Sequence, residues 1–168
     1  MFETLTQLHA ALDRVYKLAV SLPDVPLARF RAKTAGLPRT TEAERLVIQR
    51  IGQDIFRDAL TDYWGGRCPM TGITDSALLR ASHIVPWSEC SDDQRLDVHN
   101  GLLLSALWDA AFDKGLVSFT DDGRPLASPH LSGVGRNILA LEQAISLRGL
   151  RDAHRANLAI HRARHGLG

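Results

Sequence analysis

The residues best suited to catalysis lie in the middle third of the chain. His83 ends a short apolar segment, and two carboxylates, Asp109 and Asp113, follow four residues apart in a later segment. A histidine titrates near neutral pH and can act as a general base, while carboxylates are good ligands for the hard cations Mg²⁺ and Mn²⁺. In a helix, both carboxylates would lie on one face. These residue types indicate chemistry in which a base and a metal ion act together.

Four sequence blocks surround these residues. They read CPMTG, ASHIVPW, NGLLL and DAAFDKG, at 68–72, 81–87, 100–104 and 109–115. This order resembles the HNH endonuclease family, in the variant common among restriction-type nucleases, whose members show C-x-x-T-G, A-x-H-I-x-P-W, N-G-L-L-L and D-x-x-F-D-x-G blocks. One block alone would be a weak signal, but four in order are specific. The resemblance covers roughly residues 50–120, and His161-Arg162 near the C-terminus also looks family-like.

The resemblance implies a role for each residue. His83 takes the place of the general base, and Asn100 that of the residue which orients the base and pins its loop. Asp109 stands where the family usually has a histidine metal ligand, and Asp113 is either a second ligand or a brace for the helix end. The implied reaction is hydrolysis of a phosphodiester P–O3′ bond with one divalent metal ion. Mg²⁺ or Mn²⁺ is expected first, with Zn²⁺ and Ni²⁺ as alternatives.

The chain departs from the wider family in two ways. Ser82 stands where many relatives carry an Asp or His ligand, so water or Asn100 would have to complete the metal site. Paired C-x-x-C zinc knuckles are missing, because the chain has only Cys68 and Cys90. Two cysteines make neither a disulfide framework nor a four-cysteine zinc site. We expect two reduced, partly buried thiols.

Helices are expected before the motif. Leu5, Leu8, Leu12, Val15 and Ala19 recur at helical spacing over 3–20, a stripe that predicts core packing or, alternatively, a dimer seam. Residues 21–40 contain three prolines and a glycine and are expected to form a loop or linker. Thr41 and Glu44 predict a capping box for a helix that ends near Tyr63, before two glycines. We expect an N-terminal helix and linker at 1–40 and a nuclease domain at 41–168.

The motif itself predicts an α+β fold. Residues 77–84 and 101–105 are expected as strands around a loop at 85–99, followed by a helix at 106–114. This is the ββα-metal core that the resemblance implies, with helices flanking it on the N- and C-terminal sides. Asp121-Asp122-Gly123 predicts the turn of a hairpin. The tail from about 135 reads as helical, with Ile138, Leu141 and Ile145 on one face. Trp87 and Trp108 are expected in the core, and His99 as incidental.

Charge is distributed unevenly. The net charge is +1, but residues 1–67 carry +2, residues 68–135 carry −5 and residues 136–168 carry +4. An acidic middle between basic ends suits a metal site with phosphate-binding arms, or simply helix faces of different charge. The same choice applies to a C-terminal cluster, which either contacts phosphates or forms a solvated helix face. The cluster consists of Arg151, His154, Arg155, His161, Arg162, Arg164 and His165.

The sequence thus favours a metal-dependent DNA endonuclease, acting in restriction or another defence against foreign DNA. Two alternatives are a toxin-type nuclease with a neutralising partner and a degenerate HNH module that binds nucleic acid without cutting it. DNA is the expected partner, with a homodimer or a specificity or inhibitor protein as further candidates. No apolar run approaches the ~20 residues of a membrane span, and the N-terminus lacks a signal-peptide pattern. The expectation is a cytoplasmic protein without membrane contact.

Overall fold

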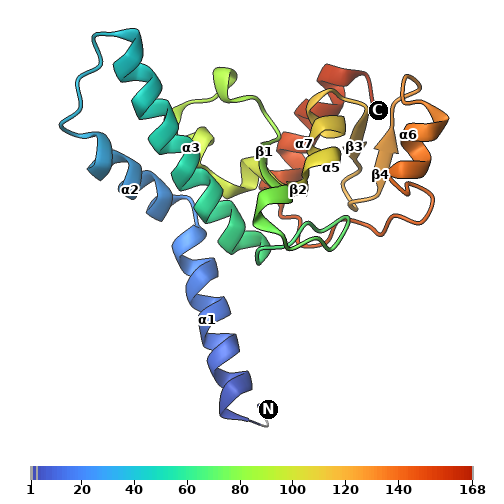
Figure 1. Cartoon of the computed structure of the whole chain (residues 1–168), viewed down its shortest axis with the longest axis horizontal. Coiled ribbons are helices and arrows are strands. Elements are labelled where there is room, and N and C mark those ends of the chain that lie inside the picture. Colours follow the sequence, from blue (N-terminus) through green and yellow to red (C-terminus); the bar gives the residue numbers. More distant parts are fainter. Residues whose placement is uncertain (1, 3, 168) are drawn as a thin grey trace.

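The computed structural model describes residue 2 and residues 4–167, with helices and two small antiparallel sheets. The mixed composition confirms the expected α+β class. One helix, α1 (Leu5–Ser21), projects from the body as an arm, and α2 (Asp24–Thr34) and the long α3 (Glu42–Trp64) border one side of that body (Figure 1). The strands and the remaining helices lie on the other side of α3.

Helix α3 (Glu42–Trp64) forms where the sequence predicted it. The Thr41 hydroxyl accepts a hydrogen bond from the Glu44 backbone N–H at 3.2 Å, and the Glu44 carboxylate accepts one from the Thr41 N–H at 2.9 Å. The predicted capping box is therefore confirmed. Gly65 ends the helix with a φ of 68°, a left-handed conformation that glycine adopts without a steric penalty.

The stretch at 21–40 is not a continuous loop, as had been expected. It contains helix α2 (Asp24–Thr34), and an irregular connection follows only after Thr34. Pro26 lies in the first turn of α2. The first backbone N–H groups of a helix have no partner inside the helix, so a proline is tolerated there. The expectation was wrong because prolines break a helix only beyond its first turn.

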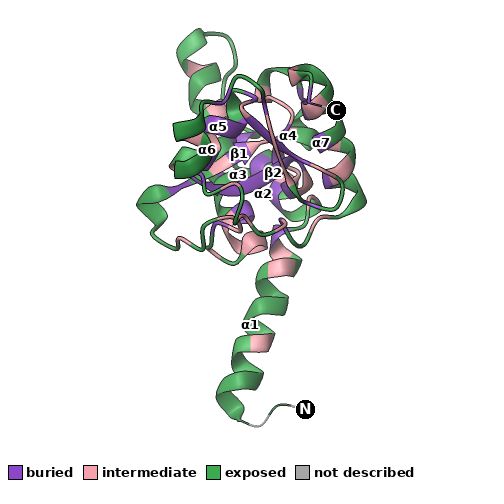
Figure 2. Cartoon of the chain, turned by 90° about the vertical axis from the view of Figure 1, so that its right-hand side faces the viewer, coloured by how far each residue is buried: buried purple, intermediate pink, exposed green. Residues whose placement is uncertain are grey.

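The apolar stripe of α1 is not buried, which contradicts its expected place in the core. Leu5 is 85% exposed, Leu12 60% and Val15 64%. Figure 2 shows most of α1 as exposed, whereas buried residues gather in the body. The buried core is formed by α3, both sheets, α5 and α7.

The sheet that positions the motif pairs β1 (Leu79–His83) with β2 (Gly101–Ser105) in antiparallel register. His83 lies opposite Gly101, and helix α5 (Ala106–Asp113) begins directly after β2. A Cβ on Gly101 would lie 2.5 Å from Phe56 of α3. Only glycine allows β2 to approach α3 this closely.

The connection between β1 and β2 was expected to be a loop but contains three short helical segments. They are η2 (Trp87–Glu89), α4 (Asp92–Leu96) and η3 (Val98–Asn100). A further short helical segment, η1 (Ser76–Leu78), lies directly before β1. Ser91 caps α4, with the Gln94 side chain bonded back to the Ser91 N–H. Local capping thus organises a polar stretch that lacks apolar periodicity.

The C-terminal part is only partly as predicted. Strands β3 (Val117–Phe119) and β4 (Pro125–Ala127) form the predicted hairpin. The tail, however, is two helices, α6 (Gly133–Ile138) and α7 (Asp152–His165), instead of one. Ala140 and Gly149 between them have φ values of 50° and 87°, which no helix continues through. None of the helices in the described residues is long and apolar enough to span a membrane.

Candidate active site

A cavity of about 270 Å³ brings His83 and Asp109 together. It lies between three elements: α3 on one side, β1 on another and the first turn of α5. The residues that line it are Arg50, Gln53, Asp54, Phe56, Arg57, Arg80, Ala81, His83 and Asp109. The two residues expected to act as base and metal ligand therefore face the same space, beside several side chains of α3.

His83 is held firmly at the end of β1. Its ring stacks on Phe56, with centroids 3.9 Å apart and planes at 20°, and meets the edge of Trp87 at 5.4 Å. Its Nε2 lies 2.9 Å from the carbonyl oxygen of Arg95. A carbonyl can only accept, so Nε2 carries the proton and Nδ1 has the free lone pair. Nδ1 has no hydrogen-bond partner in the described part of the chain.

The electrostatics of His83 favour the neutral ring. Burial lowers the pKa of His83 and the nearby Arg95 charge lowers it further, while the hydrogen bond to the Arg95 carbonyl raises it. The net direction is downward, because a buried imidazole loses hydration when it is charged. At neutral pH the ring is therefore unprotonated at Nδ1, as a general base requires.

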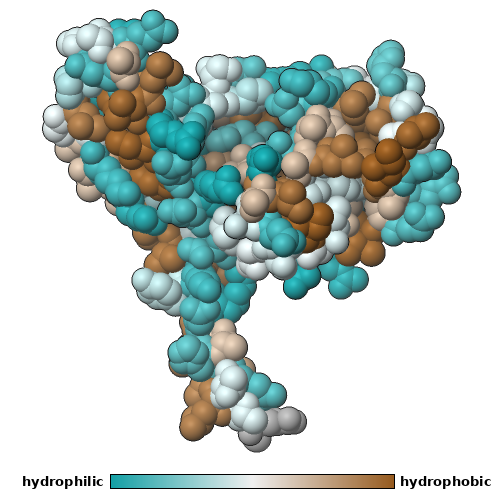
Figure 3. Space-filling view, in the orientation of Figure 1, coloured by the Kyte–Doolittle hydropathy of each residue, from teal (hydrophilic) through white to brown (hydrophobic). Residues whose placement is uncertain are grey.

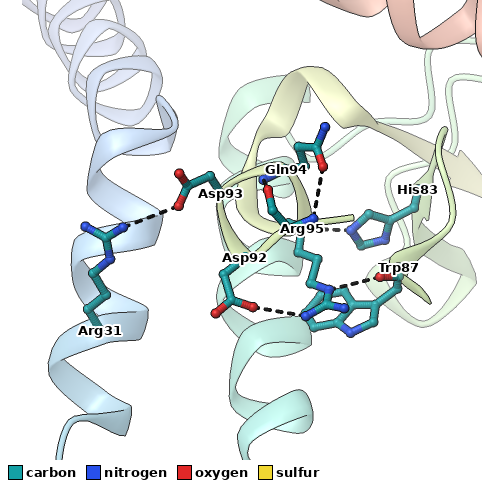
Figure 4. A network of polar contacts seen from close by, with 8 residues as sticks. Arg31, His83, Trp87, Asp92, Asp93, Gln94 and Arg95 are labelled. Carbon is teal, nitrogen blue, oxygen red and sulfur yellow. Dashed lines mark hydrogen bonds and ion pairs between the residues drawn. The ribbon is translucent and has the colours of Figure 1, made fainter. Parts of the chain in front are cut away.

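The backbone acceptor of His83 belongs to a braced segment (Figure 4). Arg95 lies in α4, whose last carbonyls have no partner within the helix. The Arg95 guanidinium donates to the Trp87 carbonyl at 2.9 Å and to Asp92 at 3.0 Å, and it lies 5.2 Å from the Trp87 ring centroid. From α2, Arg31 reaches Asp93 at 3.4 Å. Trp87 is thus half-buried beside His83 rather than in the core.

Asn100 lies behind the site, with 2% of its surface exposed. Its Oδ1 accepts from the Val85 N–H at 2.8 Å, and its Nδ2 lies 3.2 Å from the carbonyl oxygens of both Val85 and Gln94 and 3.3 Å from the Cys90 sulfur. These contacts fasten both ends of the β1–β2 connection together. Asn100 does not line the cavity.

Asp109 and Asp113 have different surroundings. Asp109 is half-buried, and burial raises its pKa, as does the charge of Asp113; a hydrogen bond from Ser82 and the Arg80 charge lower it. Ser82, which stands where many relatives have a second metal ligand, thus donates a hydrogen bond to the Asp109 carboxylate. The Asp113 side chain is 64% exposed, pairs with Lys114 at 2.7 Å and does not line the cavity.

The donor set limits the kind of metal that the site suits. Within residues 2 and 4–167, no three His, Cys, Asp or Glu side chains are grouped to hold a metal ion. Zinc sites use three or four protein ligands, whereas Mg²⁺ keeps several waters and takes one or two carboxylates plus substrate phosphates. Asp109 of α5, with Asp54 of α3 lining the same cavity, fits the second kind of ion.

The wall formed by α3 was missed in the sequence. Arg50, Gln53, Asp54 and Arg57 lie ahead of the motif but line its cavity. Their signal is a polar stripe at helical spacing, i, i+3, i+4 and i+7, next to the buried face of α3. Arg57 is anchored by a hydrogen bond to the Ser76 carbonyl at 3.0 Å, and Arg80 by bonds to the carbonyls of Ala77 and Leu79 at 2.9 Å.

A larger cavity lies elsewhere. It measures about 870 Å³ and is lined mostly by apolar side chains next to α6, without His83 or Asp109. Hydrophobic surface gathers over the α6 region in Figure 3. Because hydrolysis needs a base and charge stabilisation, the smaller cavity is the better candidate site despite its size.

The C-terminal cluster is in part buried and bonded within the chain, while phosphate contact by its exposed members, such as Arg151, stays a prediction. His154 and His161 are buried. His161 donates from Nε2 to the Phe112 carbonyl and accepts at Nδ1 from the Ser118 hydroxyl, both at 3.0 Å. Arg162 binds the Phe119 carbonyl and Asp121 at 2.8 Å, and Arg164 pairs with Glu89. The cluster fastens α7 to the body. Trp108 is in the core as expected.

The buried histidines make stability depend on pH. Burial lowers the pKa of both His154 and His161 to about 4, whereas unfolded histidines titrate near 6.5. The unfolded chain binds more protons between these values, so stability is lost as pH falls from about 6.5 to 4. We expect the urea midpoint to drop between pH 7.5 and 5, and to drop less in His154→Gln. Equal drops in the two proteins would show that His154 does not contribute.

Comparison with known proteins agrees with the geometry over part of the chain. No curated protein matches it. Residues 68–120, however, match the HNH endonuclease family. This segment runs from Cys68 through β1, β2 and α5 to the end of β3, and includes His83, Asn100 and Asp109. It leaves out the α3 wall. Over residues 68–120 the chain is therefore similar to HNH endonucleases, and this similarity suggests nuclease activity.

Proposed function

We propose that the chain is a metal-dependent DNA endonuclease that hydrolyses phosphodiester bonds with His83 as general base. The observation that carries the proposal is the orientation of His83. Its Nε2–H is bonded to the Arg95 carbonyl, and its basic nitrogen remains for a cavity shared with Asp109. Of the buried histidines, His161 has both nitrogens engaged, and His154 leaves Nε2 unpaired among the described residues. The free nitrogen of His83 differs because the His83 side chain lines a cavity together with a carboxylate.

The chain's own groups divide the work of hydrolysis. Nδ1 of His83 accepts a proton from the attacking water as its oxygen bonds to phosphorus, and the Arg95 carbonyl stabilises the imidazolium that forms. The P–O3′ bond breaks, as the resemblance implies, the leaving oxygen takes up a proton from a water molecule, and His83 later returns its proton to solvent. Arg50, Arg57 and Arg80 around the cavity supply positive charge to the phosphates.

A divalent ion would complete the charge balance. Asp109 would hold a largely hydrated Mg²⁺ or Mn²⁺, which when bound supplies Lewis acidity toward the phosphate and the leaving oxygen. Asp113 is proposed as a brace for the end of α5, because its carboxylate pairs with Lys114. A role in defence against foreign DNA rests on the resemblance to restriction-type members alone.

Cleavage of supercoiled plasmid tests the proposal directly. We expect nicked or linear product with Mg²⁺ or Mn²⁺ and none with EDTA, because the ion that Asp109 would hold supplies the Lewis acidity toward the phosphate and the leaving oxygen. Adding Mg²⁺ back to the EDTA-treated protein should restore cutting. Absence of cleavage with every ion, on unmodified and modified DNA, together with retained DNA binding, would favour the non-cutting HNH module.

Substitution of the two carboxylates of α5 distinguishes the proposed metal ligand, Asp109, from the proposed helix brace, Asp113. Asp109→Asn is expected to weaken Mn²⁺ binding, measured by calorimetry, by at least about tenfold, because it removes a charged ligand from a half-buried site. Asp113→Asn, which changes an exposed carboxylate on the same helix, is the matched control and should leave affinity nearly unchanged. The reverse pattern would give the ligand role to Asp113.

A further inference from the structure

The arm α1 presents two different faces. The face toward α3 is a stripe of Ala11, Arg14, Leu18 and Ser21, which are partly or fully buried except for Arg14. Arg14 donates to the carbonyls of Asp62 and Tyr63 at the C-terminal end of α3. These contacts fix the direction of the arm, because positive charge is favourable at the end of a helix where carbonyls are unpaired.

The second face is apolar and lies in solvent. We name it the leucine stripe, and its members share a three–four spacing along the helix, the a and d positions of consecutive heptads. Leu5, Leu12 and Val15 are 85%, 60% and 64% exposed, and Leu8 and Leu22 are 37% and 46% exposed. The stripe consists of Leu5, Leu8, Leu12, Val15, Ala19 and Leu22. Figure 3 shows hydrophobic surface along the arm.

We propose that the leucine stripe pairs with the same stripe of a second copy of this chain, with the two α1 helices antiparallel. In that register Leu5 of each copy faces Leu22 of the other, Leu8 faces Ala19, and Leu12 faces Val15. The repeat of 3.5 residues matches a partner helix with the same repeat, and a two-fold axis makes the contact self-complementary.

Charge does not oppose the pairing. Asp13, Arg14 and Lys17 lie off the stripe, so no charge is buried by pairing. Within each copy Asp13 pairs with Lys17 at 2.9 Å, and Arg14 donates to the carbonyls of Asp62 and Tyr63. These charges therefore keep their own partners when two stripes meet.

The size of the contact predicts a weak dimer. Burying one aliphatic side chain removes roughly 60–120 Å² of apolar surface, so five large stripe residues on each copy give at most roughly 600–1,200 Å², because Leu8 and Leu22 are already partly covered. Specific interfaces begin at about 1,000 Å². The pairing is helped because α3 already orders the arm, which reduces the entropy lost on association. We expect dimers at tens of micromolar protein, and more at higher concentration.

Sedimentation equilibrium of the full chain tests the pairing without reference to activity. The wild-type mass is expected to rise toward that of a dimer with concentration, and Leu12→Glu should remain monomeric. Ala10→Glu introduces the same charge on the opposite, exposed side of α1 and should dimerise like the wild type. Circular dichroism checks that both variants keep their helices. A wild-type chain that stays monomeric throughout, or equal effects of both variants, would overturn the proposal.

Cross-linking tests the direction of the helices. Antiparallel pairing places the two Leu5 positions about 25 Å apart, since 17 residues at 1.5 Å separate Leu5 from Leu22. Under oxidation, Leu5→Cys combined with Leu22→Cys should give a covalent dimer, and Leu5→Cys alone should not. The buried Cys68 and Cys90 are common to all the proteins. Efficient cross-linking of Leu5→Cys alone would show a parallel pair and overturn the register.

One consequence rests on the proposed nuclease function. Each chain has one candidate active site, so a dimer would bring two sites to the two strands of a duplex. Leu12→Glu is expected to keep the nicking rate per chain but to convert nicked plasmid to linear plasmid at least about tenfold more slowly. If the wild-type chain neither nicks the plasmid nor converts it to the linear form, the proposed nuclease function is contradicted. The pairing of the α1 helices would still be decided by sedimentation equilibrium.

Discussion

Replacement of His83 by alanine is expected to lower the rate of plasmid cleavage by about 10²–10⁴-fold, the usual contribution of a positioned general base. The reason is the fixed tautomer: Nε2–H is held by the Arg95 carbonyl, and Nδ1 is the basic atom available in the cavity that also contains Asp109. Mn²⁺ binding should change little, because the proposed metal ligand is Asp109.

A second variant distinguishes the loss of the basic nitrogen of His83 from the loss of its packing. His83→Gln can still donate a hydrogen bond toward the Arg95 carbonyl but has no basic nitrogen, so it should be as inactive as His83→Ala while retaining more stability. His130→Ala, which removes an exposed histidine, is the matched control and should cut at the wild-type rate. Substantial activity in His83→Gln would mean that His83 positions the loop and that another group takes the proton.

The pH profile follows from the direction of the His83 shift. Burial lowers the pKa of His83, so the base form persists below the usual value near 6.5. Activity measured as kcat/KM is therefore expected to stay level from pH 8 to about 6.5 and to fall at more acidic pH. A fall that already begins above pH 7 would contradict a buried, neutral base.

The parts of the fold that were predictable are those fixed by short-range rules. The capping box at Thr41, the turn around Gly123 and the two strands of the motif depend on residues a few positions apart, and all formed as expected. The α2 helix was missed for a related reason: the position of Pro26 within a first turn becomes visible only once the helix start is known.

The parts that were not predictable depend on long-range contacts. The acceptor for His83 is the backbone carbonyl of Arg95, and a backbone group leaves no trace in the sequence. Gln53 and Asp54 of the α3 wall lie 26 and 25 residues before Leu79, the first residue of β1, so the motif alone does not include them. Buried polar side chains are equally hard to predict. The sequence placed His154 and His161 at the surface, yet both are buried, as is Leu158 on the same helix.

Asn100 and His83 are bonded to neighbouring backbone carbonyls, those of Gln94 and Arg95. Asn100→Ala is therefore expected to lower both stability and activity. The substitution leaves the Val85 N–H and the Val85 and Gln94 carbonyls without their amide partner. Each buried polar group left unpaired costs about 1–3 kcal/mol, so we expect a loss of about 2–5 kcal/mol in the free energy of unfolding, measured by urea titration. Asn137→Ala, at an exposed position, should change stability by less than about 0.5 kcal/mol.

The effect on activity should exceed the loss of folded protein. Asn100 and His83 both bond to carbonyls at the end of α4, those of Gln94 and Arg95, so freeing one carbonyl lets the other move. A displacement of about 1 Å at a catalytic group costs roughly 10²-fold in rate, and rates measured where Asn100→Ala is still folded should show a loss of that order. Asn100→Asp restores an acceptor for the Val85 N–H but not the donors to α4, so it should recover little of the rate. If rates per folded molecule instead match the wild type, the end of α4 is held without Asn100, and the base is oriented by Phe56 and Trp87 alone.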